Sequence, residues 1–224
     1  MNSEVKESAG STDDTFRLEV EGFFSKADSK IDAVAEGIGD ADTTALDRAK
    51  SFQLALSEAG LAGITYSEEY GGAGLTDRHQ EIFSGVASNW DSPTSPFSIS
   101  HGMCLPMLNQ FGTHEQKLQF MPDNISGKTI WCQLFSEPGA GSDVASLATR
   151  AVLDGDEWII NGQKVWTSGA HYCDYGIVIA RTDPSLPKHR GLTMFIIDMT
   201  DSAIDVRPLK QISGGKGFDE IFFT

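Results

Sequence analysis

Residues Trp131 to Ser168 read WCQLFSEPGAGSDVASLATRAVLDGDEWIINGQKVWTS, in which a glycine-rich turn is followed by a run of strand-forming residues. Segment 137–143, EPGAGSD, places one proline and two glycines where the backbone must turn tightly. The hydroxyls of Ser136 and Ser142 lie beside the N–H groups that such a turn exposes. This turn suits an anion or the polar edge of a ring.

The end of the same stretch carries an aromatic residue and two hydroxyls. Trp166 can present a flat aromatic face, although the commoner fate of a tryptophan on a strand is the core. Thr167 and Ser168 follow it and can donate hydrogen bonds to a ring nitrogen or oxygen. Together with the glycine-rich turn, these residues predict a site for a planar, phosphorylated cofactor.

The sequence around this stretch predicts strands from Lys128 onward. β-branched and aromatic runs alternate with turn pairs, and Asp154-Gly155 and Asn161-Gly162 are strong hairpin signals. This half therefore predicts a small antiparallel barrel or sandwich. The expected strands are 129–135, 147–153, 157–160, 163–167, 175–181, 192–198, 203–209 and 218–223.

The first half has helical periodicity instead. One apolar stripe has Ser11 or Thr12 as candidate caps, a second stops at Gly60, and Thr113 with Gln116 predicts a capping box. The composition changes near Gly127, which predicts a domain boundary there. The expected helices contain Phe16, Val20, Phe23, Phe24, Ala27, Ile31 and Val34; Ala45, Ala49, Phe52, Leu56 and Ala59; Ile82, Phe83, Val86, Ala87 and Trp90; residues 97–111; and the residues after Thr113.

The quoted stretch resembles the acyl-CoA dehydrogenases, whose Thr/Ser-Glu-Pro-Gly-Ala-Gly-Ser-Asp signature and later Trp-x-Ser/Thr element hold FAD. HGMCLPMLNQFGTHEQKLQFMPDNISG (101–127) and KHRGLTMFIIDM (188–199) are also similar to segments of that family. The resemblance runs from about residue 15 to Thr224, where GGKGFDEIFFT looks like the family's final barrel strand.

The resemblance implies an α+β fold. It comprises a flexible N-terminus (1–14), an all-α helical domain (15–127) and an antiparallel β-barrel domain (128–224) that binds FAD and acyl-CoA. In the family a further helical domain follows and supplies the catalytic base. We therefore expect an incomplete enzyme and name no catalytic residue in this chain.

The resemblance also implies the cofactor contacts. The residue at the Ser136 position binds the flavin ring, and the residue at the Ser168 position donates a hydrogen bond to flavin N5. Ser142 lies near the FAD phosphates and the bound thioester, so it is also the expected substrate-binding residue. The full expected FAD set is Gln133, Leu134, Phe135, Ser136, Gly141, Ser142, Trp166, Thr167 and Ser168.

The implied reaction is α,β-dehydrogenation of an acyl-CoA thioester to the trans-2-enoyl-CoA, as in the β-oxidation of fatty acids. An electron-transferring flavoprotein is the expected electron acceptor, and the complete protein is expected to be a homotetramer or heterotetramer. An acyl-CoA oxidase, a flavin monooxygenase on the same scaffold and a non-catalytic partner subunit remain alternatives. Straight-chain, branched and ring-bearing acyl groups all remain open.

Other classes of site are disfavoured. A net charge of −15 argues against nucleic-acid or membrane-surface binding. Five histidines lack metal-ligand spacing, three dispersed cysteines suggest neither a disulfide framework nor a zinc cluster, and Ser142 lacks the G-x-S-x-G elbow of acyl hydrolases. Glu68 and Glu69 are expected in a solvated turn, and Glu137 is expected to be structural. The polar N-terminus has no secretory signal, so we expect a cytoplasmic protein.

Overall fold

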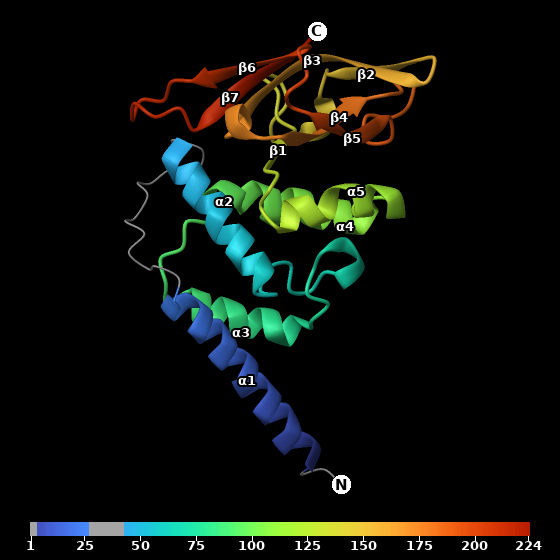
Figure 1. The fold of residues 1–224 in the computed structure, drawn as a ribbon. Coiled ribbons are helices and arrows are strands. Elements are labelled where there is room, and N and C mark those ends of the chain that lie inside the picture. Colours follow the sequence, from blue (N-terminus) through green and yellow to red (C-terminus); the bar gives the residue numbers. More distant parts are fainter. Residues whose placement is uncertain (1–3, 27–42) are drawn as a thin grey trace. The chain divides into compact units, whose positions relative to one another are not determined.

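The computed structural model describes residues 4–26 and 43–224, and the chain forms two compact units (Figure 1). Among the described residues, the first unit contains 4–26, 43–95 and 107–128. The second unit contains 96–106 and 129–224. The chain therefore passes from the first unit to the second at residue 96 and returns to the first at residue 107. From Thr129 to its last residue it belongs to the second unit.

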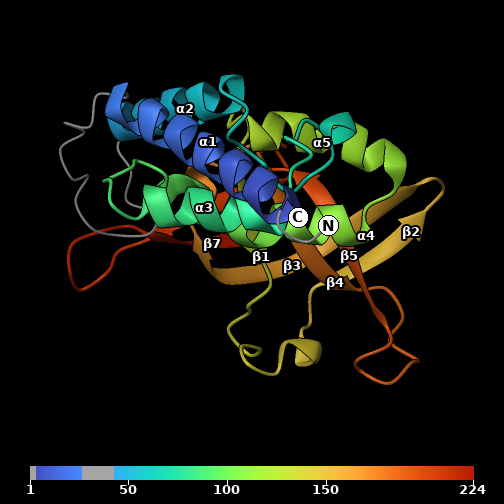
Figure 2. The same ribbon diagram turned by 90° about the horizontal axis from the view of Figure 1, so that it is seen from below.

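The first unit is helical. Helices α1 and α3 lie side by side in both views (Figures 1 and 2), and α1 buries Phe16, Val20 and Phe24. The Phe24 ring stacks on Trp90 with centroids 5.9 Å apart. The helices are α1 (Glu4–Lys26), α2 (Thr43–Glu58), α3 (Asp77–Ala87) and α5 (His114–Ile125), with a short 3-10 turn at Glu68–Tyr70.

The observed helix ends can be compared with the capping residues predicted from the sequence. The predicted capping box is confirmed, because Thr113 Oγ1 accepts from Gln116 N at 3.2 Å and Gln116 Oε1 accepts from Thr113 N at 2.9 Å. The predicted caps of the first helix are wrong, since Ser11 and Thr12 lie inside α1. Ala27, Ile31 and Val34 of the predicted first stripe lie outside the described residues.

The expected helix over 97–111 is confirmed over 98–111, but it is irregular near its start. A 3-10 turn (Ser95–Phe97) precedes a π-helical turn (Ser100–Cys104), and α4 (Leu105–Phe111) follows. Pro106 has no N–H to donate within the helix, and the Leu105 N–H bonds to Ser100 O in the wider π pattern. The π turn therefore lies just before the proline, and the helix continues through it to Phe111.

The second unit contains one curled sheet of seven strands, visible from its edge in Figure 1. Strands β1, β4, β2, β3, β7 and β6 follow one another in that order, and β5 pairs with β4. The strands are β1 (Trp131–Leu134), β2 (Arg150–Asp154), β3 (Glu157–Ser168), β4 (Tyr175–Arg181), β5 (Leu192–Asp198), β6 (Ile204–Leu209) and β7 (Phe218–Phe223).

The sheet is mixed, so the expectation of a purely antiparallel barrel is wrong in its pairing. β1 runs parallel to β4, and β2 meets β4 in parallel at Arg150 and Arg181. The physical reason is the crossover between them: the β2–β3 hairpin reverses direction before the chain re-enters the sheet at β4. The α+β class, with helices first and a curled half-barrel afterwards, is confirmed.

The two predicted hairpin turns have opposite outcomes. Asp154 pairs with Glu157 across a two-residue loop that contains Gly155 at φ 64°, so that turn is confirmed. The turn at Asn161-Gly162 is wrong, because β3 continues through it. Asn161 ends the pairing with β2 and Gly162 begins the pairing with β7. The Asn-Gly pair marks a change of partner strand.

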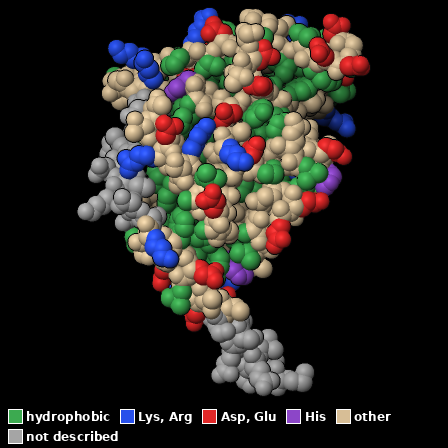
Figure 3. Space-filling view, in the orientation of Figure 1, with side chains coloured by type: hydrophobic (Ala, Val, Ile, Leu, Met, Phe, Trp, Pro, Cys, Tyr) green, Lys and Arg blue, Asp and Glu red, His purple; other side chains and the backbone are tan. Residues whose placement is uncertain are grey.

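On the face shown in Figure 3, acidic and basic side chains are interspersed among apolar ones. No helix within the described ranges is long and apolar enough to cross a membrane.

Candidate functional site

The site is built first from the turn after β1. Glu137 N donates to Ala140 O at 2.8 Å, and Ala140 N donates back to Glu137 O at 3.1 Å, which closes a tight loop over Pro138 and Gly139. Neither Gly139 nor Gly141 has a left-handed φ, and a Cβ on either would meet nothing within 4 Å. The chain itself therefore does not require glycine at these two positions.

A buried ion pair anchors this turn to β3. Lys164, whose side chain is 0% exposed, donates from Nζ to Glu137 Oε1 at 2.9 Å and to Phe135 O at 3.1 Å. The Glu137 carboxylate also accepts the backbone N–H groups of Ala148 at 2.6 Å and Thr149 at 2.9 Å. Glu137 thus has the structural role expected from the sequence.

Burial and hydrogen bonding act in opposite directions on this pair. Burial raises the pKa of Glu137, but the bonds from Ala148, Thr149 and Lys164 outweigh it and keep the pKa below the ordinary 4.5. Burial lowers the pKa of Lys164, and the contact with Glu137 opposes that change. Both groups gain from being charged together, so removing either leaves an unpaired charge inside the sheet.

A small cavity lies where the end of β1 meets the end of β3. Its volume is about 80 Å³, and Val165 N donates to Ser136 O at 2.9 Å to join its two walls. This is far below the roughly 300–1,000 Å³ of a typical small-molecule pocket, so it can take the edge of a ring but not a dinucleotide. The lining residues are Ile99, Gln133, Phe135, Ser136, Val165, Trp166 and Ser168.

Trp166 has an unusual backbone for its size. Its φ is 61°, the left-handed region, and it is the only non-glycine residue with a positive φ in the part of the chain that the structure describes. The register of β3 against β7 shifts here, so Val165 and Trp166 together oppose Glu220 in a β-bulge. The bulge turns the indole outward, and Trp166 is 62% exposed.

The structure brings together only part of the predicted site. Gln133, Phe135, Ser136, Trp166 and Ser168 line the cavity. The other four predicted residues do not line it: Leu134 is buried, Thr167 is 2% exposed and its Oγ1 makes no hydrogen bond with the described residues, and Gly141 and Ser142 are exposed in the loop.

Sequence reasoning did not assign several residues to the site. Ile99 and Val165 line the cavity, and neither residue type carries a chemical signal. Lys164 gave no signal, because a lysine in a strand pattern is ordinarily expected on the exposed face. His171 follows the Trp166–Ser168 segment, and Asp219 pairs with Thr167 across the sheet. The two side chains contact each other at 2.9 Å, and no sequence motif indicates either of them.

The three cysteines, although dispersed in the sequence, meet in the second unit. All are buried and free, and Cys104 Sγ donates to Cys132 O at 3.5 Å. A hydrogen bond with the Cys132 thiol, together with burial, raises the pKa of Cys173. Such thiols are poor nucleophiles. No group of three or more metal-ligating side chains occurs among the residues that the structure describes.

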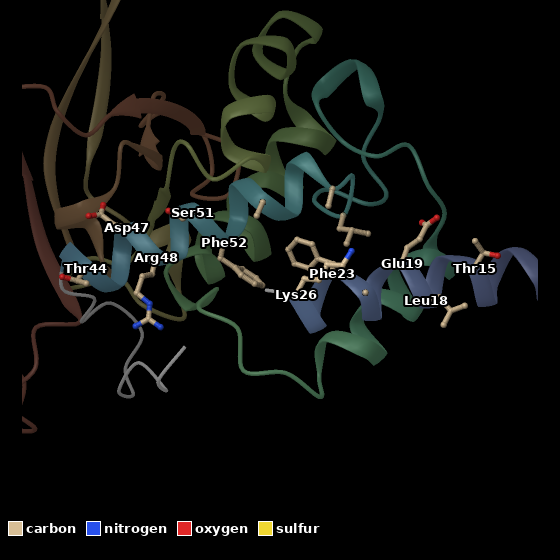
Figure 4. Close-up of a pocket in the computed structure, with 14 residues that line it drawn as sticks. Thr15, Leu18, Glu19, Phe23, Lys26, Thr44, Asp47, Arg48, Ser51 and Phe52 are labelled. Carbon is tan, nitrogen blue, oxygen red and sulfur yellow. The ribbon is translucent and has the colours of Figure 1, made fainter. Parts of the chain in front are cut away.

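A larger cavity, about 1,220 Å³, lies in the first unit between α1 and α2 (Figure 4). Its lining includes Phe23 and Phe52, in edge contact at 5.8 Å, and the charged side chains of Lys26, Asp47 and Arg48. It contains none of the predicted cofactor residues. The smaller cavity is the candidate site, because hydroxyls and an exposed, strained aromatic converge there.

Two family models match the chain that carries this arrangement, a glycine-rich turn tied to a bulged strand that presents Trp-Thr-Ser. The acyl-CoA dehydrogenase N-terminal domain matches residues 13–128, and the acyl-CoA dehydrogenase middle domain matches residues 132–224. The chain belongs to the acyl-CoA dehydrogenase family.

One relative in that family comes from a mycobacterium. The chain is 37% identical over 210 residues to the acyl-CoA dehydrogenase IpdE1 of Mycobacterium tuberculosis, covering 93% of this chain and 54% of that protein. The chain therefore spans about half the length of that relative.

Two solved structures have the same fold. The Tcur3481-Tcur3483 steroid ACAD aligns with TM-score 0.76 at 29% identity, over 96% of this chain and 54% of that chain. The ChsE4-ChsE5 complex of Mycobacterium tuberculosis aligns with TM-score 0.75 at 28% identity, over 95% of this chain and 53% of that chain.

Proposed function

We propose that the chain is the flavin-binding part of an acyl-CoA dehydrogenase that converts an acyl-CoA thioester into the trans-2-enoyl-CoA. The observation that carries this proposal is the cavity between β1 and β3, where the outward-turned indole of Trp166 lies beside the hydroxyls of Ser136 and Ser168. A left-handed tryptophan costs of order 1–3 kcal/mol, and such strain clusters at functional sites.

The residues present fit the edge of a flavin ring. Ser136 and Ser168 offer hydroxyl donors on the two walls, and an exposed indole offers a flat face beside them. A ring edge needs few contacts of this kind, and its remaining surface extends outside a cavity of this size. When bound, FAD accepts the hydride that leaves the Cβ atom of the thioester.

Each cavity residue has a separate task in this proposal. Ser168 donates its hydroxyl hydrogen bond to flavin N5, and Ser136 binds the ring with its backbone and hydroxyl. Trp166 covers the ring and keeps water from it. Gln133 and Phe135 complete the wall on the β1 side. We assign no catalytic base among the described residues.

The loop after β1 is the proposed position for phosphates and for the thioester. Gly139 and Gly141 are not required by the fold, and glycine lets a ligand approach the backbone closely. Ser142 is exposed in the same loop and can donate to a phosphate or to the thioester ligand. The open face of this loop therefore supports the predicted role of Gly141 and Ser142 outside the cavity.

Similar proteins support the proposed acyl group and partners. Among straight-chain, branched and ring-bearing thioesters, the ring-bearing class has the support of the relative described as a steroid dehydrogenase. The ChsE4-ChsE5 complex supports a heteromeric assembly in which a second dehydrogenase chain joins this one. An electron-transferring flavoprotein remains the proposed electron acceptor.

The test is an equilibrium titration of the chain with FAD, followed by the visible flavin spectrum. The unaltered chain should bind FAD, and Trp166→Ala should weaken binding about tenfold or more, because it removes the aromatic face. Ser168→Ala should weaken it by about fivefold through one lost hydrogen bond. Trp158→Ala is the matched control, since Trp158 is an exposed tryptophan on β3 that contacts Phe195 and lies outside the cavity.

No binding of FAD, or equal losses in Trp166→Ala and Trp158→Ala, would contradict the site assignment. With FAD bound, reduction by a ring-bearing acyl-CoA under anaerobic conditions tests the reaction. Rapid reaction of the reduced flavin with oxygen would assign the chain to the oxidases instead.

A further inference from the structure

The segment that follows Ser168 is tied to β7 by a single buried carboxylate. Asp219, which is 0% exposed, accepts the backbone N–H of His171 at 3.2 Å and the His171 Nδ1–H at 2.9 Å. Both donors belong to one residue of the short 3-10 turn Ala170–Tyr172. A buried carboxylate is costly unless hydrogen-bonded, so these two bonds fix where the turn can lie.

This contact lies next to the cavity residues in the sheet. Asp219 pairs with Thr167, and Phe218 pairs with Ser168, in the register of β3 against β7. Asp219 shares the buried face of β7 with Ile221 and Phe223, so its backbone is fixed by the core. The strand that carries Ser168 is therefore bounded by the bulge at Trp166 on one side and by the Asp219–His171 contact on the other.

The turn between Ser168 and His171 has little freedom. Gly169 has φ 62°, its N–H donates to Gly217 O at 3.2 Å, and a Cβ there would come within 2.2 Å of Tyr172 Oη. The Tyr172 ring in turn meets the His171 ring edge to face, with centroids 5.1 Å apart. Because the turn is this tight, a change in the position of His171 is transmitted to Ser168.

We propose that Asp219 and His171 form a clamp that positions the Ser168 hydroxyl and the Trp166 indole toward the flavin ring. The proposal rests on the proposed function of the cavity. Neither clamp residue lines the cavity, so both are positioning residues that act through Ser168. With a proton on Nδ1, the His171 ring donates to the Asp219 carboxylate at 2.9 Å.

The test uses FAD titration and the visible flavin spectrum of the 224-residue chain and its variants. His171→Ala should weaken FAD binding roughly tenfold and shift the flavin spectrum, because the Ser168 donor loses its fixed position. His171→Asn should restore most of the affinity and the spectrum, since its amide nitrogen occupies the place of Nδ1. His189→Ala, in the exposed β4–β5 loop, is the matched control and should behave as the unaltered chain.

A purely structural role predicts a different pattern. It would lower the midpoint of thermal unfolding in His171→Ala while leaving the spectrum of the bound flavin unchanged, and that result would overturn the clamp. Asp219→Leu, which has a similar size and removes both oxygen acceptors, provides a second variant if His171→Ala does not fold, and unchanged affinity and spectrum there would also overturn the clamp. If the unaltered chain takes up no FAD, the proposed function fails and the clamp falls with it. If the unaltered chain binds FAD and the clamp variants keep the same affinity and flavin spectrum, the proposed function stands without the clamp.

Discussion

Lys164 and Glu137 join the two segments that line the cavity, one from β3 and one from the turn after β1. Together with the Val165 N–H to Ser136 O bond, the Lys164 contacts with Phe135 O and Glu137 set the distance between the walls. The structural role of Glu137 was predictable, because it belongs to a turn that must be anchored. Its partner was not, since the β-strand pattern gives no reason for a buried lysine at 164.

Replacing Lys164 should be one of the most damaging single changes in the second unit. Lys164→Met leaves the Glu137 carboxylate buried without its counter-charge, and breaking a buried pair in this way costs about 3–5 kcal/mol of unfolding free energy. Urea unfolding measures the loss. Lys188→Met is the control, because the Lys188–Asp143 pair is exposed and should contribute below about 1 kcal/mol. Equal losses in the two variants would show that the buried pair has no special role.

The pair also predicts a pH dependence. Because the folded-state pKa of Glu137 lies below the ordinary 4.5, its contribution to stability is present above that pH and is lost as the pH falls through the folded-state value. The difference in unfolding free energy between the unaltered chain and Glu137→Gln should therefore shrink below about pH 4.5. Denaturant unfolding at several pH values between neutral and acid checks this, and a difference that widens toward acid pH contradicts it.

At the scale of elements, strand bounds were well predicted and strand neighbours were not. β4, β5 and β7 have the predicted bounds, because their apolar alternation is regular and turns flank them. Which strands pair is decided by long-range contacts, and no local pattern in β1 or β4 shows that they run parallel. The hairpin prediction at Asn161-Gly162 also failed because of a long-range contact, since Gly162 lies where β3 closely approaches another segment of the chain.

Gly162 allows β3 to pass from β2 to β7. Its φ is 153°, and a Cβ would lie 2.5 Å from Thr149 Oγ1 and 2.7 Å from Thr149 Cα. Gly162→Ala should therefore lower the unfolding free energy by about 2 kcal/mol or more, measured by denaturant unfolding. Gly155→Ala is the control, because it is left-handed without any crowding and should cost only about 1 kcal/mol. A smaller loss at Gly162 than at Gly155 would contradict the close approach.

At the scale of the whole molecule, the order of a helical part followed by a curled sheet was predictable from the change in periodicity near Gly127. The cavity itself was predictable only in part. Five of the nine expected cofactor residues line it, because they occur in two short motifs whose spacing survives folding. The supporting contacts through Lys164, His171 and Asp219 depend on which strands meet, and so they emerge only from the structure.

The measurement that tests the central claim most directly is the nuclear magnetic resonance signal of FAD isotopically labelled at N5. On binding to the chain, the N5 resonance should move in the direction of a stronger hydrogen bond, and Ser168→Ala should move it back toward its position in free FAD. An N5 resonance that is unchanged on binding, or that moves equally in Ser168→Ala, would contradict a flavin ring held at the Ser136, Trp166 and Ser168 cavity.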